Sequence, residues 1–174
     1  MRAGLAVRLD ELDRDLGRLL EQVTALGDDR GRRRPTPGRW GPFEIVEHLV
    51  LVHEGVAAVL ERASPRVPPG RLVSWWRPIA MTLVLRSRAR VKAPTSRVLP
   101  SPTPPPLEVL GRRWREAQRA IRSSLAGKGA GWGDRAIFRH PLAGWLGAGE
   151  TLQFLIDHLR HHQRQIPETA RFLP

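Results

Sequence analysis

Two histidines four residues apart, His158 and His162, are the side chains of this chain best suited to chemistry. They lie near the end of a segment with helical periodicity, where residues i and i+4 share one face, so their imidazoles could bind one divalent cation. His161, between them, points to another side. The zinc-protease signature has this spacing with a glutamate after the first histidine, but Leu159 stands there, which argues against such a protease. Because the pair alone could be a solvated polar stripe, a metal site requires a third ligand.

His48 is the natural third ligand, because it lies on a second strongly helical segment far away in the sequence. Pro42 suits the first turn of that helix. Apolar residues then recur at three- and four-residue steps, at Ile45, Leu49, Val52, Val56 and Val59 or Leu60. His48 lies beside this stripe, where the alternative is a histidine at the margin of the core that is satisfied by a carbonyl group or water. If the two helices converge, three histidines could bind one ion.

The motifs around these histidines follow a recognisable order. Trp40 precedes the helix that carries His48, the tripeptide at residues 140–142 is His-Pro-Leu, and Thr-Leu-Gln-Phe-Leu at residues 151–155 leads into the segment from His158 to Ile166. In this order the chain resembles the DinB/YfiT-like superfamily. The resemblance spans the whole chain in element order, although the specific motifs lie only at residues 40–49 and 140–166.

The resemblance implies both a fold and a metal site. Members of this superfamily are four-helix bundles in which one histidine of the second helix and an H-x-x-x-H pair of the last helix bind a divalent metal. The match falls on His48, His158 and His162. Gln165 and Ile166 resemble the Gln-Ile that commonly follows the second histidine of that pair.

A site of this kind favours catalysis over a purely structural role. Three neutral imidazoles leave coordination positions open, whereas a structural zinc site normally has four protein ligands. A metal with open positions lowers the pKa of a bound thiol or water, which supplies a nucleophile near neutral pH. Characterised relatives include thiol-dependent S-transferases and isomerases, so the resemblance implies a transferase that conjugates a low-molecular-weight thiol to an electrophile, with zinc, nickel, manganese or iron as the metal. A metal-dependent hydrolase and a non-catalytic metal- or ligand-binding bundle are the alternatives.

Composition limits the other functions. The chain has 174 residues, enough for one domain spanning 1–174, and it contains no cysteine, which excludes disulfides and a cysteine nucleophile. The net charge of +12 would suggest a nucleic-acid partner, but the arginines are dispersed and no nucleic-acid-binding motif accompanies them. We therefore expect a small-molecule substrate, which the positive charge would suit if it is anionic. Residues 1–9 lack the apolar core of a secretion signal, so the expected location is the cytoplasm, without membrane insertion.

The periodicity predicts an all-α fold, a four-helix bundle with helices at about 3–26, 42–62, 107–126 and 150–166. Residues 28–38 are expected to form a loop and residues 132–149 a loop with turns, and no strand pattern is evident. Pro167 is expected to end or kink the last helix.

The connection between the second and third predicted helices is unusually long. Five prolines between residues 100 and 106, after Pro94, predict an extended crossing segment, which suits a bundle whose second and third helices run parallel. The apolar stretch within residues 71–91 predicts an extra short helix. It is interpreted as core, as a wall of a substrate pocket or as a face of an expected homodimer.

Several residues near the three histidines are candidates for a supporting role. Glu44, Asp157 and Gln165 have the spacing to orient the imidazoles, although Glu44 and Asp157 are expected to face solvent, as charged helix residues usually do. Trp40 and Trp145 are expected to pack the bundle ends, with a pocket mouth as the alternative. His140 is interpreted as a capping or packing residue.

Overall fold

The computed structural model has four long helices, which confirms the predicted all-α bundle. They are α1 (Ala3–Thr24), α3 (Pro42–Arg62), α5 (Leu107–Gly127) and α6 (Ala148–Arg171). Each begins and ends within a few residues of its predicted position, except at the end of α6. The structure describes residues 3–63, 98–127, 136–140 and 144–172.

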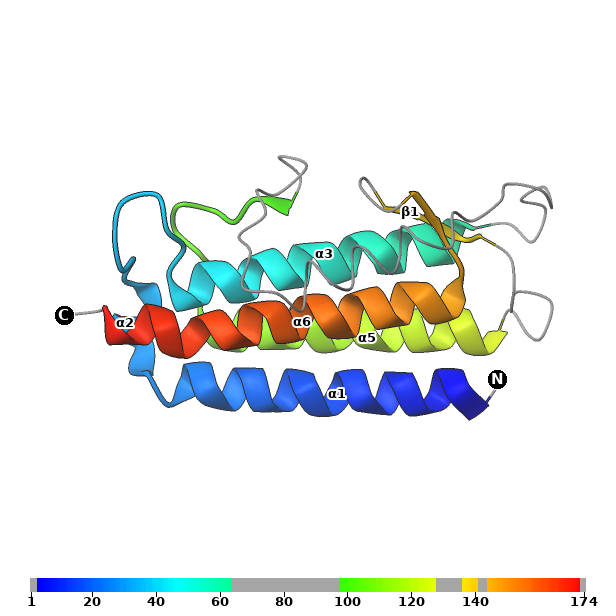
Figure 1. The fold of residues 1–174 in the computed structure, drawn as a ribbon, viewed down its shortest axis with the longest axis horizontal. Helices are drawn as coiled ribbons and strands as arrows, with labels where there is room; N and C mark the ends of the chain where they lie inside the picture. The colour runs from blue at the N-terminus through cyan, green and yellow to red at the C-terminus, as the bar shows by residue number, and fades with distance from the viewer. Residues whose placement is uncertain (1–2, 64–97, 128–135, 141–143, 173–174) are drawn as a thin grey trace.

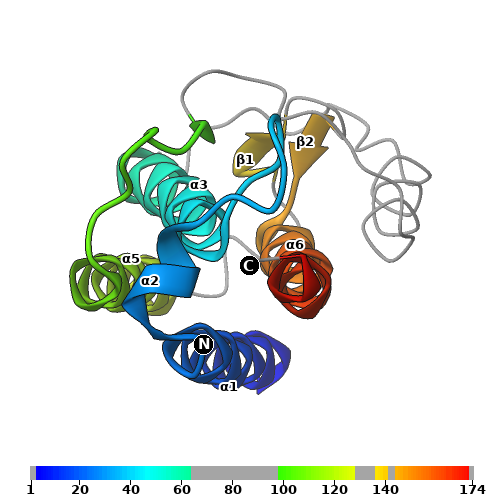
Figure 2. The ribbon, with the colours of Figure 1, turned by 90° about the vertical axis from the view of Figure 1, so that its left-hand side faces the viewer.

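The four helices lie side by side, with α3 packed chiefly on α5 and α1 chiefly on α6 (Figures 1 and 2). The colours of Figure 1 show that α3 and α5 run in the same direction, while α1 and α6 both run the opposite way. The predicted parallel arrangement of the second and third long helices is therefore confirmed. Because α3 also contacts α6, side chains from the middle of these two helices can meet inside the bundle.

Apolar residues at helical spacing form one continuous core between the four helices. In α1, for example, Leu9, Leu12, Leu16, Leu19 and Val23 are buried, and they follow one another at three- and four-residue steps. Among the described residues, no helix is both long and apolar enough to cross a membrane.

A short helix, α2 (Gly27–Arg32), stands where a loop was predicted, so the loop prediction was wrong over these residues. Its first turn carries Asp28 and Asp29, which suit the positive end of the helix dipole, and Arg32 pairs with Asp28 at 2.8 Å. The helix packs on α3 at Gly31, where a Cβ atom would lie 2.1 Å from the ring of Phe43. A residue larger than glycine would not fit there.

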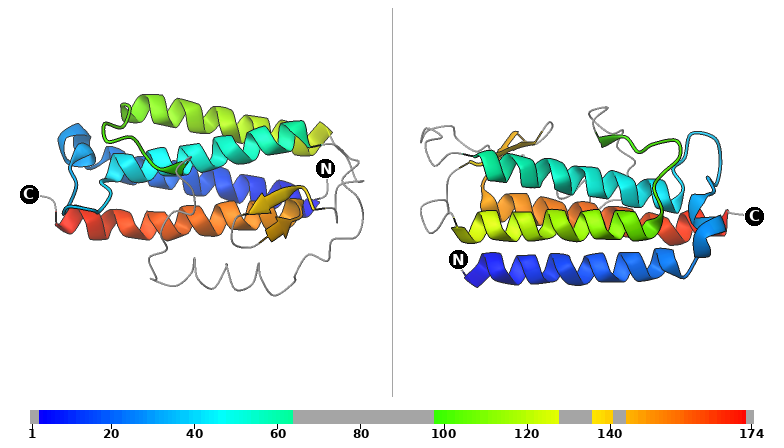
Figure 3. Two further views of the ribbon diagram at one scale, coloured as in Figure 1. Left: turned by 90° about the horizontal axis from the view of Figure 1, so that it is seen from above. Right: turned by 180° about the vertical axis from the view of Figure 1, so that it is seen from behind.

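Two short antiparallel strands, β1 (Phe138–His140) and β2 (Gly144–Leu146), lie beside the start of α6 and were not predicted (Figures 2 and 3). Each has only three residues, which is too few for an alternating apolar pattern to stand out in the sequence. The pairing places His140 opposite Gly144 and Trp145 opposite Arg139.

Helix α6 continues through Pro167 to Arg171, so of the two expectations for Pro167, an end or a kink, the end of the helix was wrong. Proline removes one backbone donor, yet neighbouring contacts can hold the following turn in place. Ile166 is buried in the core on one side of the proline. On the other side, Arg30 of α2 donates a hydrogen bond of 2.9 Å to the carbonyl oxygen of Ala170. This tertiary contact stabilises the last turn.

The end of the long crossing segment is neither helix nor strand, as predicted. Residues 99–106 contain no helix or strand, and they run beside α3 toward the start of α5 (Figure 3). The predicted short helix within residues 71–91 lies outside the described residues.

Candidate metal centre

The structure brings together the three histidines that the sequence singled out. His48 from α3 meets His158 and His162 from α6, and one ring nitrogen from each lies within 4.8 Å of the others. Nε2 of His158 lies 3.3 Å from Nε2 of His48 and 3.2 Å from Nε2 of His162. Three nitrogens from helices 110 residues apart in sequence therefore converge on one point.

These distances fit a shared metal ion. Two nitrogens bound tetrahedrally to one zinc ion, at about 2.1 Å each, lie about 3.4 Å apart. Neutral imidazole is a common ligand of divalent transition metals. The described residues thus contain a buried three-histidine cluster that could hold a metal ion.

The environment keeps the three imidazoles neutral. Burial lowers the pKa of His48, although its hydrogen bond to Val98 acts in the opposite direction. Burial, together with repulsion from the neighbouring histidines, lowers the pKa of His158 well below its ordinary value. Burial, with repulsion from His48 and His161, lowers the pKa of His162 to about 3. Neutral rings keep the lone pairs that a metal ion requires.

Two of the three rings are oriented through their other nitrogen. Nδ1 of His48 donates to the carbonyl oxygen of Val98 at 2.6 Å, and Nδ1 of His162 donates to Oε1 of Gln165 at 2.9 Å. Hydrogen bonds of this kind turn the Nε2 lone pair toward the metal position. Nδ1 of His158 is buried and has no hydrogen-bond partner among the described residues.

Aromatic rings surround the cluster. The ring of Trp40 lies 4.8 Å from that of His48 and 6.3 Å from that of His162, and Trp40 is partly exposed. Trp40 therefore flanks the cluster, and it also packs against the hydrophobic core. Phe154 stacks on His158 with 5.3 Å between ring centroids. His140 packs against Phe154 at 4.6 Å, which agrees with its predicted packing role.

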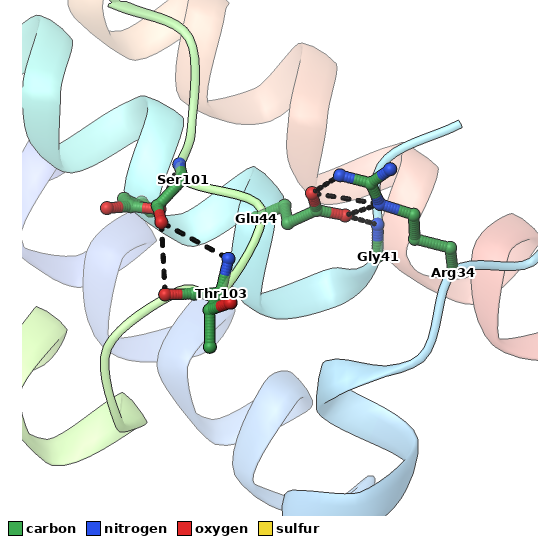
Figure 4. Close-up of polar contacts among 6 residues, drawn as sticks. Arg34, Gly41, Glu44, Ser101 and Thr103 are labelled. Carbon is green, nitrogen blue, oxygen red and sulfur yellow. Dashed lines mark hydrogen bonds and ion pairs between the residues drawn. The ribbon is translucent and has the colours of Figure 1, made fainter. Parts of the chain in front are cut away.

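The prediction that Glu44 and Asp157 face solvent was wrong, because each is only 2% exposed. Glu44 forms a two-pronged ion pair with Arg34 and accepts a hydrogen bond of 2.8 Å from the backbone of Gly41 (Figure 4). Its position three residues after Gly41, at the start of α3, is the usual place for a glutamate that caps a helix N-terminus. That spacing could have revealed the buried role. Gln165, by contrast, does contact a ring of the cluster, as predicted.

Three further features of this region were not predicted. His161 is not part of the cluster, but it is buried and joined to His162 through Gln165. The contact of His48 with the backbone carbonyl group of Val98 could not be predicted, because every residue has such a group. His53, one and a half turns after His48, is fully buried in α3 beside Trp114, with ring centroids 5.1 Å apart. Its position on the apolar stripe of α3 could have indicated that it is buried.

The fold and the cluster together define a helical bundle with a potential three-histidine metal centre. A family model described as the DinB superfamily matches residues 11–166, and the chain belongs to this superfamily. No curated protein and no solved structure matches the chain.

Proposed function

We propose that this protein is a divalent-metal-dependent enzyme that activates a low-molecular-weight thiol for transfer to an electrophile. The observation that carries the proposal is the convergence of three Nε2 atoms, from His48, His158 and His162, in a buried setting that keeps all three rings neutral. Three protein ligands are typical of catalytic metal sites. Membership of the DinB superfamily supports the metal site, and the resemblance to thiol-dependent relatives supports the reaction class.

The residues of this chain would hold and shield the reacting group. When bound, a metal ion with open positions lowers the pKa of a thiol, which is then available as thiolate near neutral pH. His48 and His162 are fixed by their Nδ1 hydrogen bonds, so their Nε2 atoms need little rearrangement. His158 is partly exposed, whereas His48 and His162 are buried, so a thiol would approach from the side of His158. Trp40 and Phe154 exclude water from the flanks of the cluster.

Two alternatives share the same metal site. A metal-dependent hydrolase would use water in place of the thiol, and a non-catalytic bundle would bind a metal or ligand without turnover. The number of ligands favours the enzyme, because three histidines leave a coordination position for an exchangeable ligand. We also propose that the substrate is a small anionic molecule and that the protein forms a homodimer.

Elemental analysis of untagged protein tests the metal site. We expect near-stoichiometric zinc, nickel, manganese or iron in the unmodified chain and its loss in His48→Ala, His158→Ala and His162→Ala. His53→Leu is the matched control, because it removes a buried histidine of α3 that is not in the cluster. Absence of metal from the unmodified chain, even after incubation with each ion, would overturn the proposal.

The reaction class needs a separate experiment. We expect the metal-loaded protein to accelerate the conjugation of glutathione or cysteine to a chromogenic electrophile such as chlorodinitrobenzene, and the chelated protein to lose this activity. Metal binding without thiol transfer, but with hydrolysis of an activated ester, would favour the hydrolase. Metal binding with neither activity across panels of thiols, electrophiles and esters would favour the binding module.

A further inference from the structure

His162 can bind a metal through Nε2 only if its ring proton is on Nδ1. A neutral imidazole carries one proton, and the hydrogen bond made by one ring nitrogen decides which of the two holds it. For His162 the hydrogen-bond partner is Gln165, whose Oε1 lies 2.9 Å from Nδ1. An acceptor at this place holds the proton on Nδ1 and leaves the lone pair on Nε2.

The amide of Gln165 could also face the other way, with opposite consequences. A side-chain amide has an acceptor oxygen on one side and a donor nitrogen on the other. If the nitrogen faced His162, Nδ1 would have to accept a hydrogen bond and the ring proton would move to Nε2. The metal position would then be blocked. The orientation of this one amide therefore matters for metal binding.

A second histidine contacts the other side of this amide. Nε2 of Gln165 lies 3.0 Å from Nε2 of His161, which accepts a hydrogen bond when its own proton is on Nδ1. Gln165 follows His161 by four residues and His162 by three, so both contacts form along one face of α6. His161 is buried, as is His162, and both contacts lie within a single helix.

We propose that His161 and Gln165 are positioning residues that select the metal-binding tautomer of His162, through a hydrogen-bonded series from His162 to Gln165 to His161. This inference rests on the proposed metal centre. It assigns a role to His161, the histidine that lies next to the cluster without belonging to it. Removing the hydrogen-bond partner of a metal-binding histidine typically changes metal affinity about 10- to 100-fold.

Three substitutions test the series. Gln165→Leu removes both hydrogen bonds, and His161→Phe removes the acceptor that orients the amide. Gln165→Glu keeps an acceptor for Nδ1 of His162 and should rescue the site. Gln163→Leu is the matched control, because it removes a partly exposed glutamine of the same helix that does not contact the cluster.

Zinc affinity, measured by competition with a chromogenic chelator, is the first readout. We expect Gln165→Leu to weaken binding about 10- to 100-fold. We expect His161→Phe to weaken it less, because the amide can still adopt the productive orientation part of the time. Gln165→Glu and Gln163→Leu should stay within a few-fold of the unmodified chain. Unchanged affinity in both Gln165→Leu and His161→Phe would overturn the inference while leaving the metal centre intact.

Nitrogen NMR of the metal-free protein is the second readout, which a merely structural role would not change. The ring signals of His162, assigned by their loss in His162→Ala, should report a proton on Nδ1 in the unmodified chain and a shift toward Nε2 in Gln165→Leu. This measurement does not require bound metal, so it separates failure of the inference from failure of the proposed function. If Gln165→Leu does not fold, the same measurement is made on His161→Phe. A proton that stays on Nδ1 of His162 in that variant, as in the unmodified chain, would overturn the inference.

Discussion

The backbone N–H of Ser101 donates a hydrogen bond of 2.8 Å to the buried carboxylate of Glu47. The next residue of α3, His48, donates to the carbonyl oxygen of Val98. Two consecutive residues of the helix therefore hold both ends of the segment Val98–Ser101. Because one of them belongs to the histidine cluster, the place of this segment and the orientation of His48 depend on each other.

Replacing Glu47 should disturb both stability and metal binding. We expect Glu47→Ala to lower the free energy of unfolding by about 1–3 kcal/mol, because Ser101 N–H loses its acceptor in a partly buried place. We also expect weaker zinc binding, since Val98 is then less well held against His48. Glu47→Gln keeps an acceptor oxygen and should stay close to the unmodified chain. Urea unfolding and zinc competition measure the two effects, and equal losses in both variants would contradict the hydrogen-bond account.

The second prediction concerns the ion pair between Arg34 and Glu44. Glu44 is 2% exposed, and its carboxylate accepts hydrogen bonds from Nε of Arg34 at 3.0 and 2.9 Å (Figure 4). The pair raises the pKa of Arg34, chiefly through the hydrogen bond to Glu44. We expect Arg34→Ala to cost about 1–3 kcal/mol, below the usual figure for a fully buried pair because Arg34 itself is 47% exposed.

The lysine variant separates charge from geometry at this position. Arg34→Lys keeps the positive charge but cannot form the two-pronged contact, so its loss in stability should lie between that of Arg34→Ala and zero. Chemical denaturation of the three proteins gives the order. An Arg34→Ala variant as stable as the unmodified chain would show that the pair contributes nothing measurable.

The sequence predicted the helices and the three histidines because both leave local signals. Apolar residues at helical spacing mark α1, α3, α5 and α6, and the spacing of His158 and His162 on one such helix marks the cluster. His48 was the candidate third ligand because it lies on a second helical segment, and the resemblance to a known superfamily then supported that choice. These parts of the structure depend on periodic patterns over many residues.

The features that were missed depend on contacts between distant residues. The buried Glu44 is paired with Arg34, ten residues earlier, and the last turn of α6, beyond Pro167, is contacted by Arg30 of another helix. The acceptor for His48 is the carbonyl group of Val98, which every residue has and no sequence pattern marks. Single-sequence patterns report which face of a helix is apolar, but not which polar groups will find partners across the fold.

The packing of α2 on α3 gives a further prediction. At Gly31 a Cβ atom would lie 2.1 Å from the ring of Phe43, so Gly31→Ala forces the two helices apart. We expect a loss of about 1–3 kcal/mol, as for other overpacked sites. Gly55→Ala is the matched control, because its Cβ atom meets nothing within 4 Å and alanine favours a helix interior over glycine by about 1 kcal/mol. Thermal unfolding should therefore show opposite shifts, and a stabilised Gly31→Ala would contradict this packing.

The fully buried His53 makes the stability of the metal-free protein depend on pH. Its pKa is lowered to about 3, mainly by burial and to a smaller extent by repulsion from His48. In the unfolded chain the pKa is about 6.5. Between these values the unfolded state binds more protons than the folded state, so the free energy of unfolding falls as pH is lowered from about 6.5 toward 3. Above about pH 7.5, where His53 is neutral in both states, this group has no effect. The slope for one histidine is at most about 1.4 kcal/mol per pH unit.

Burial also lowers the pKa of the three histidines of the cluster and of His140, so these groups act in the same direction. The difference between two proteins therefore isolates His53. We expect the stability of His53→Leu relative to the unmodified chain to be constant near pH 7.5, where His53 is neutral in both the folded and the unfolded state, and to be higher at pH 5 than at pH 7.5. Urea unfolding with a chelator present, at several pH values between 7.5 and 4.5, measures the difference. It should widen steadily below pH 6.5, because leucine cannot bind the proton that favours unfolding. Parallel stability curves would mean that His53 becomes protonated within the folded protein.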